Sequence, residues 1–230
     1  LEQALSPVYF RYLEVQSKAM SPEIVEDMIE ENQLTSEYSK LMAGLEFEFR
    51  GEKLSRAALA AYFKDDDRET RKEAYTVFGH GMNAVAPQLD DIFDRMVKVR
   101  TRMAKKMGYD SFTQLGYYRM NRVCYGQKEV ETFRRNVLEA ITPAVARMRT
   151  ENAKKLGLDT YMFYDDGVII PGGDPKPMGG KEEIFAAARE MYHQMSEESG
   201  KFIDMMLENE AFDVDPRKNK WGGGYCTEIP

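Results

Sequence analysis

Histidine is scarce in this sequence: only His80 and His193 are present. His80 lies in Gly79-His80-Gly81, which we interpret as a helix interruption, and His193 lies inside an apolar helical pattern. No His-Glu-x-x-His or His-x-x-x-His pair occurs, and a catalytic zinc ion needs about three protein ligands. The sequence therefore predicts no zinc site built from adjacent histidines. A nucleophile turn of the type Gly-x-Ser-x-Gly and a phosphate loop of the type Gly-x-x-x-x-Gly-Lys are also missing.

Carboxylates are abundant, and most of them fall on predicted helices. The neighbours Asp165-Asp166 lie in a long loop and allow two interpretations, an acid pair or an acidic loop tip that serves solubility. We expect Arg68, Arg71 and the pair Arg100/Arg102 to form ion pairs with nearby acids, as helical arginines commonly do.

The most informative stretch for binding is Trp221–Thr227, which reads Trp-Gly-Gly-Gly-Tyr-Cys-Thr. Glycines let a backbone or a ligand approach closely, and the residues after them favour a strand. One interpretation is a flexible linker or hairpin turn. The other is a strand edge against which an extended peptide lies, with Gly223, Gly224 and Tyr225 as candidate substrate-binding residues.

The elements that must position these residues are mostly helices. Period-two alternation over 45–50 predicts one short strand that ends in a turn. Pro143 should kink the helix that contains it. The helical patterns begin at Ser21-Pro22-Glu23, cover 54–63, begin again at an N-cap cluster over 65–67, and cover 88–107, 128–156 and 181–207.

Composition excludes several classes of protein. The chain has 230 residues, of which 43% are hydrophobic, and a formal net charge of −7. It is too apolar to be disordered, and no apolar run approaches the roughly 20 residues that span a bilayer. The acidic balance argues against nucleic acid and anionic membranes as partners. Cys124 and Cys226 form neither a disulfide framework nor a metal-ligand pair, which favours a cytoplasmic location.

From Leu54 onward the sequence resembles the oligoendopeptidase F family, which belongs with the thimet-oligopeptidase-like zinc metallopeptidases. The closing segment is the most specific, because it is similar to the Gly-Gly-Tyr-Cys-Thr segment that shortly precedes the zinc helix in that family. The stretches that carry the resemblance are Lys64–Tyr75, Val99–Tyr109, Met191-Tyr192 with Met195-Ser196, and Trp221–Pro230.

The resemblance implies a mainly α-helical fold whose long helices line a deep channel, with a small sheet beside the metal. Zinc would be held by the two histidines of a His-Glu-x-x-His helix and a later glutamate, and the motif's own glutamate would act as general base. None of these positions exists here, so we assign no catalytic residue and no metal ligand to this chain. We expect the chain alone to bind no catalytic zinc and to cleave no peptide, and the intact parent to hydrolyse internal bonds of short peptides.

The same resemblance, with both chain ends looking cut, makes us expect 1–230 to be an incomplete helical part of a peptidase domain. Helices and one short strand region would occupy 1–156, a Gly- and Pro-rich loop 157–180, and a helix with a Gly-rich strand near 222–229 the remainder. The competing hypothesis is a helical interaction scaffold with no catalytic parent. The sequence sets no oligomeric state.

Overall fold

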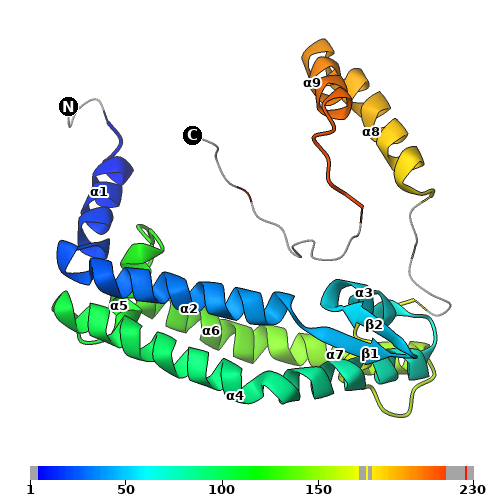
Figure 1. The fold of residues 1–230 in the computed structure, drawn as a ribbon, viewed down its shortest axis with the longest axis horizontal. Helices are drawn as coiled ribbons and strands as arrows, with labels where there is room; N and C mark the ends of the chain where they lie inside the picture. Colours follow the sequence, from blue (N-terminus) through cyan, green and yellow to red (C-terminus); the bar gives the residue numbers. More distant parts are fainter. Residues whose placement is uncertain (1–4, 171–174, 176–177, 216–225, 227–230) are drawn as a thin grey trace. The chain divides into compact units, whose positions relative to one another are not determined.

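The computed structural model describes residues 5–170, 175, 178–215 and 226. The chain divides into two compact units, Leu1–Gly167 and Val168–Pro230. Helices dominate both units (Figure 1), and the described residues contain a single two-stranded sheet. The prediction of a mainly α fold is therefore confirmed.

The first unit contains seven α-helices separated by short turns within its described residues. They are α1 (Pro7–Ala19), α2 (Val25–Ala43), α3 (Arg56–Ala60), α4 (Arg68–Lys106), α5 (Phe112–Arg119), α6 (Gln127–Asn136) and α7 (Thr142–Lys155). Shorter helical turns are η1 (Pro22–Ile24), η2 (Ala61–Lys64), η3 (Val137–Ile141) and η4 (Phe163–Asp165).

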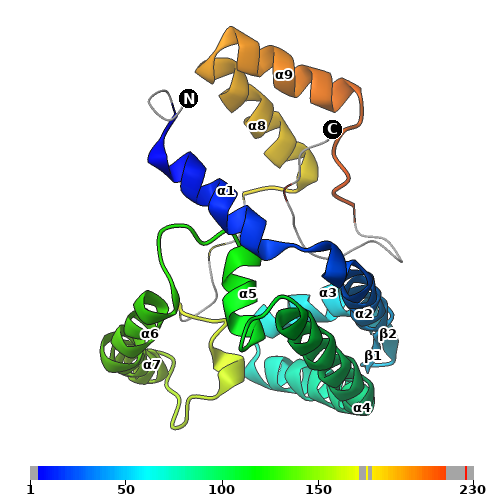
Figure 2. The same cartoon turned by 90° about the vertical axis from the view of Figure 1, so that its left-hand side faces the viewer.

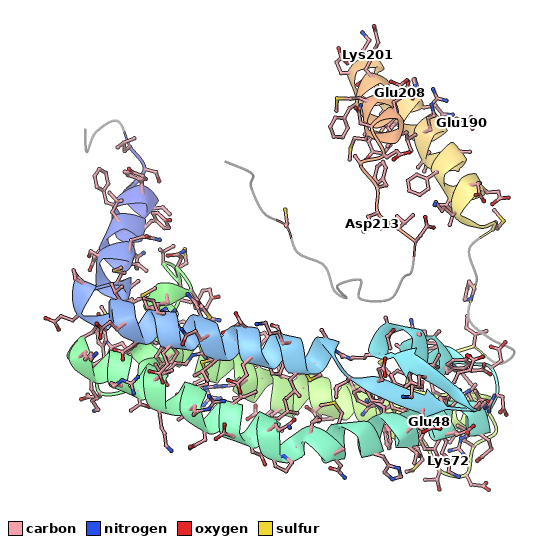
Figure 3. All side chains as sticks on the ribbon, in the orientation of Figure 1. Glu48, Lys72, Glu190, Lys201, Glu208 and Asp213 are labelled. Carbon is pink, nitrogen blue, oxygen red and sulfur yellow. The ribbon has the colours of Figure 1, made fainter. Side chains whose placement is uncertain are left out.

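The predicted strand exists and pairs with a second strand that was not predicted, whose last two residues the sequence analysis assigned to the helix over 54–63. Strand β1 (Glu46–Phe49) lies antiparallel to β2 (Glu52–Ser55), with Phe47 opposite Leu54. Arg50 and Gly51 both have positive φ, which a two-residue hairpin turn requires. Phe47 and Phe49 are buried, while Glu48 between them is exposed (Figure 3).

Helix α4 is one continuous helix of 39 residues, so the predicted interruption at Gly79-His80-Gly81 is wrong. The glycine at position 81 has a packing reason: a Cβ there would lie 2.5 Å from the Phe47 ring. Pro87 also lies inside α4, directly before the start of the helix predicted over 88–107, so two predicted helices are one. The helix begins where predicted, because Asp67 accepts a hydrogen bond from the Thr70 backbone N–H at 2.9 Å.

The first unit has two buried apolar clusters, one at each end of α4. Helices α2 and α4 lie side by side and run in opposite directions (Figure 1). The cluster between them and α5 comprises Ile24, Met103, Ala104 and Leu115. The cluster beneath the hairpin comprises Phe47, Phe49, Leu59 and Ala74.

Helices α6 and α7 form one long helical segment joined by the π-helical turn η3. Pro143, at which a kink was predicted, follows this π-helical turn directly: the proline has no N–H, and the Thr142 hydroxyl donates to the Val137 carbonyl at 3.2 Å. The segment lies apart from the α2–α4 pair (Figure 2), and none of its residues is buried.

The described part of the second unit is a helical hairpin of α8 (Lys181–Met195) and α9 (Glu197–Glu208). The predicted single helix over 181–207 is therefore wrong. Ser196 adopts an extended backbone and caps α9, which ends the first helix and begins the second. Glu190, Lys201 and Glu208 project from this hairpin (Figure 3). No helix in the described ranges is long and apolar enough to cross a membrane.

Candidate functional site

The three predicted substrate-binding residues, Gly223, Gly224 and Tyr225, lie outside the described residues. The predicted strand near 222–229 lies outside them as well, except for Cys226, which is exposed and belongs to no strand. Both assignments stay predictions.

Residues that could hold a metal ion are not gathered in the described part of the chain. No group of three or more histidine, cysteine, aspartate or glutamate side chains there is arranged for a metal. His193 contacts one carboxylate, Asp204, at 3.0 Å, and that carboxylate is already bound by Arg189 at 2.6 Å. Two donors, one of them neutralised by a guanidinium, do not fit a zinc site that needs about three protein ligands.

Asp165 is the most deeply placed charged group of the first unit, and it joins the loop after α7 to the first turns of α4. Its carboxylate accepts hydrogen bonds from Arg68 at 2.9 Å through two nitrogens and from Arg71 at 3.0 Å. The Met162 backbone N–H donates a further bond at 2.9 Å. The side chain is 0% exposed, so this cluster is a buried, fully bonded ion site.

The two arginines of this site also bind backbone carbonyls. Arg71 donates to the carbonyls of Tyr164 at 3.0 Å and Asp65 at 2.8 Å, and Arg68 donates to that of Thr160 at 2.9 Å. Burial favours the neutral acid at Asp165, but the arginines and the backbone N–H outweigh it and hold its pKa below the ordinary value. The site therefore fixes the loop conformation, and the acid-pair interpretation of Asp165-Asp166 is not supported by this geometry.

Asp166 has a different role from its neighbour. Arg149 of α7 binds it through two nitrogens at 3.0 and 2.5 Å, and both side chains are substantially exposed. This pair connects the end of the α6–α7 segment to the loop that the buried site fixes. The two adjacent aspartates thus bind different elements, and neither carboxylate contacts the other's partner among these arginines.

A second set of buried carboxylates joins α2 to α4 and α5. Glu31 accepts from Arg100 at 2.7 Å and from Arg119 at 2.6 Å. Asp27 accepts from Arg102 at 2.6 Å and pairs with Lys106 at 2.7 Å. Desolvation opposes their ionisation, yet the cations hold the pKa of both carboxyls below the ordinary range.

The expected arginine ion pairs are therefore present, but their partners are far away in the sequence. Arg68 and Arg71 lie three residues apart, which places them on one face of α4. From the sequence alone, this spacing could have predicted that the two arginines share one acidic partner. The identity of the partner, Asp165, depends on tertiary packing that spacing does not reveal.

The hairpin of the second unit carries a surface cavity of about 680 Å³. Its lining combines two aromatic rings, Phe185 and Phe212, whose centroids lie 5.1 Å apart, with several carboxylates. Lys181 pairs with Asp215 at 2.6 Å across the lining. The cavity is open and mixed in polarity, and it contains no histidine or cysteine among its lining residues.

Comparison with known proteins identifies the family. Residues 61–167 match the model of peptidase family M3. A solved oligoendopeptidase F from Bacillus anthracis strain Ames is 34% identical with a TM-score of 0.85, over 96% of this chain and 40% of that one. A second oligoendopeptidase F structure is 36% identical with a TM-score of 0.89, over 98% of this chain and 40% of that one.

A third solved structure, PZ peptidase A with an inhibitor, is 36% identical with a TM-score of 0.87, over 96% of this chain and 39% of that one. The chain thus spans about 40% of the length of the solved structures it matches. A search of curated proteins found no match. These matches confirm the resemblance to the oligoendopeptidase F family: residues 61–167 match peptidase family M3, and almost the whole chain follows solved members at 34–36% identity.

Proposed function

We propose that this chain is part of a zinc metallo-oligoendopeptidase that hydrolyses internal peptide bonds of short peptides. The observation that supports this most strongly is the identity of 34–36% to solved oligoendopeptidase F and PZ peptidase chains over almost the whole sequence. Identity at that level, with the fold preserved throughout, is unusual for a scaffold of unrelated origin.

The role we propose for the first unit is a rigid wall of the substrate channel. Buried carboxylates bind α2 to α4 and α5, and Asp165 binds the loop after α7 to α4. Removing one partner of a buried ion pair is costly, so these contacts resist sliding of the helices. A wall that holds its shape admits an extended short peptide and excludes a folded protein.

The residues we propose for substrate contact are Gly223, Gly224 and Tyr225. Their main-chain groups would pair with the backbone of an extended peptide, as in strand addition to a sheet edge. Two glycines in a row leave the backbone accessible from both faces.

The metal that we propose for the parent is zinc, with ligands outside this chain. When bound, zinc polarises the scissile carbonyl and lowers the pKa of its bound water. The described residues of this chain do not form that site, so their part is limited to shaping the channel and orienting the peptide. A cytoplasmic location fits two exposed cysteines that form no disulfide.

The experiment compares this 230-residue chain with the product of the complete gene. Zinc content is measured by mass spectrometry after dialysis, and activity by cleavage of internally quenched peptides of five to fifteen residues. We expect one tightly bound zinc and cleavage only in the longer product, which should also contain a His-Glu-x-x-His helix. Stoichiometric zinc in this chain would overturn the assignment of the ligands, and a complete product without metal or cleavage would favour the scaffold.

A further inference from the structure

The α6–α7 segment carries a row of exposed apolar side chains that nothing in the described structure covers. Isolated exposed apolar residues are ordinary, whereas a contiguous row marks a contact surface. Phe133 is 66% exposed, Ile141 54% and Met148 62%. We call the row formed by Phe133, Leu138, Ile141, Val145 and Met148 the α6–α7 stripe.

A helical segment with an apolar stripe is stabilised when that stripe packs against another surface. Most of the stability of a helix in a protein comes from packing its apolar face, since isolated helices are marginal in water. Here the contacts lie at the ends: Glu129 accepts from the Gly126 backbone N–H at 2.8 Å, and Arg149 binds Asp166. Between these ends, no hydrogen bond or ion pair joins the segment to another element within the described part of the chain, and the helix continues through the π turn.

Charge indicates what kind of surface fits the stripe. Residues 127–155 contain seven basic and four acidic side chains, in a chain whose net charge is −7. Arg134, Arg135 and Arg147 lie beside the stripe in the sequence and are exposed. A complementary surface would have apolar side chains at its centre and carboxylates at its rim.

A second copy of this chain is a poor candidate for the cover. A twofold pair would present the same basic segment to itself, which places like charges opposite one another. The solved relatives offer a better candidate, since each continues well beyond the 39–40% of its length that this chain matches.

We propose that the α6–α7 stripe is an internal interface of the intact peptidase, covered by polypeptide from the part of the fold that this chain does not span. The covering surface is apolar at its centre and acidic at its rim. The inference rests on the proposed function, because it requires a longer parent, and it adds a specific surface by which this chain and the remainder of the parent hold together.

Single-cysteine labelling tests the proposal. In a background with Cys124→Ser and Cys226→Ser, Ile141→Cys and Met148→Cys each place a thiol on the stripe. Glu139→Cys places the control thiol on the same segment away from the stripe. Maleimide labelling rates are measured in this chain and in the complete gene product under native conditions.

We expect both stripe thiols to react freely in this chain and at least about tenfold more slowly in the complete product, while the Glu139→Cys thiol reacts at similar rates in both. Equal rates at the stripe in both proteins would overturn the proposal, as would a gene that encodes no further sequence. Concentration-dependent protection within this chain alone would overturn it in favour of a second copy.

Peptide cleavage by the same variants separates this inference from the proposed function. A complete product that cleaves peptides but leaves the stripe reactive would refute the interface and retain the peptidase. A complete product that protects the stripe but cleaves nothing would retain the interface and refute the peptidase.

Discussion

Two adjacent aspartates give a matched test of the buried ion site. Asp165 is 0% exposed and binds both Arg68 and Arg71, whose side chains are 33% and 4% exposed. Asp165→Asn keeps the shape but leaves Arg71 buried without its counter-charge, which costs about 3–5 kcal/mol. Asp166→Asn weakens an exposed pair with Arg149, and that pair is worth at most about 1 kcal/mol.

The assay is urea unfolding of this chain followed by circular dichroism, with hydrogen exchange to locate the change. We expect Asp165→Asn to lower the unfolding free energy severalfold more than Asp166→Asn, and to speed exchange in the loop after α7 and at the start of α4. Equal and small losses for the two variants would refute the view that Asp165 is a buried ionic anchor.

Acid titration of stability adds an independent measurement. The pKa of Asp165 is lowered in the folded protein, so its contribution is present above the unfolded value near 3.9 and is lost as pH falls through the folded value. We therefore expect the stability of the wild-type chain to fall below about pH 4. Asp165→Asn should remove part of that slope, because asparagine does not titrate, and an unchanged slope would contradict the assignment.

Two further predictions concern glycines. Gly81→Ala places a Cβ 2.5 Å from the buried Phe47 ring, so an overpacking cost of about 1–3 kcal/mol should exceed the gain in helix propensity of about 1 kcal/mol. Gly79→Ala has nothing within 4 Å of its new Cβ and should stabilise the chain by up to about 1 kcal/mol. Equal stabilisation of both variants in thermal unfolding would contradict this packing. Gly200→Ala places a Cβ 2.5 Å from the His193 ring, which is half-exposed and can rotate away. We therefore expect the stability to change by less than about 1 kcal/mol and the NMR shifts of the His193 imidazole to report loss of its contact with Asp204. Unchanged shifts would be inconsistent with the close approach of residue 200 to this ring.

Local chemistry in the sequence predicted the places where elements begin and turn. Asp67 caps α4, and the alternation over 45–50 forms β1, because both signals depend on neighbours within a few residues. Strand β2 was missed because Glu52-Lys53 has little intrinsic strand preference and is ordered by pairing with β1. The break at Ser196 was missed because apolar periodicity continues on both sides of it.

Long-range contacts were beyond the reach of spacing. The glycine at 81 looked like a helix breaker, and only the position of Phe47 shows that it permits close packing. The sequence left Asp165 open between an acid pair and an acidic loop tip, and neither interpretation included the two arginines of α4 that bind it. The candidate substrate contacts Gly223, Gly224 and Tyr225 came from local composition and resemblance, and they stay predictions.

The contrast between buried and exposed apolar residues allows one more test of the α6–α7 stripe. Leu115 is 0% exposed between α2, α4 and α5, so Leu115→Ala should cost about 2–5 kcal/mol in this chain. Ile141 is 54% exposed, so Ile141→Ala should change the stability of this chain by no more than about 0.5 kcal/mol.

In the complete gene product the stability cost of Ile141→Ala should rise toward that of Leu115→Ala, because the interface would bury Ile141 and its truncation would then leave a cavity. Thermal and urea unfolding of both variants in both proteins gives four values to compare. A core-like loss for Ile141→Ala in this chain alone would mean that the stripe is already covered without the rest of the parent, and the proposed interface would then be wrong.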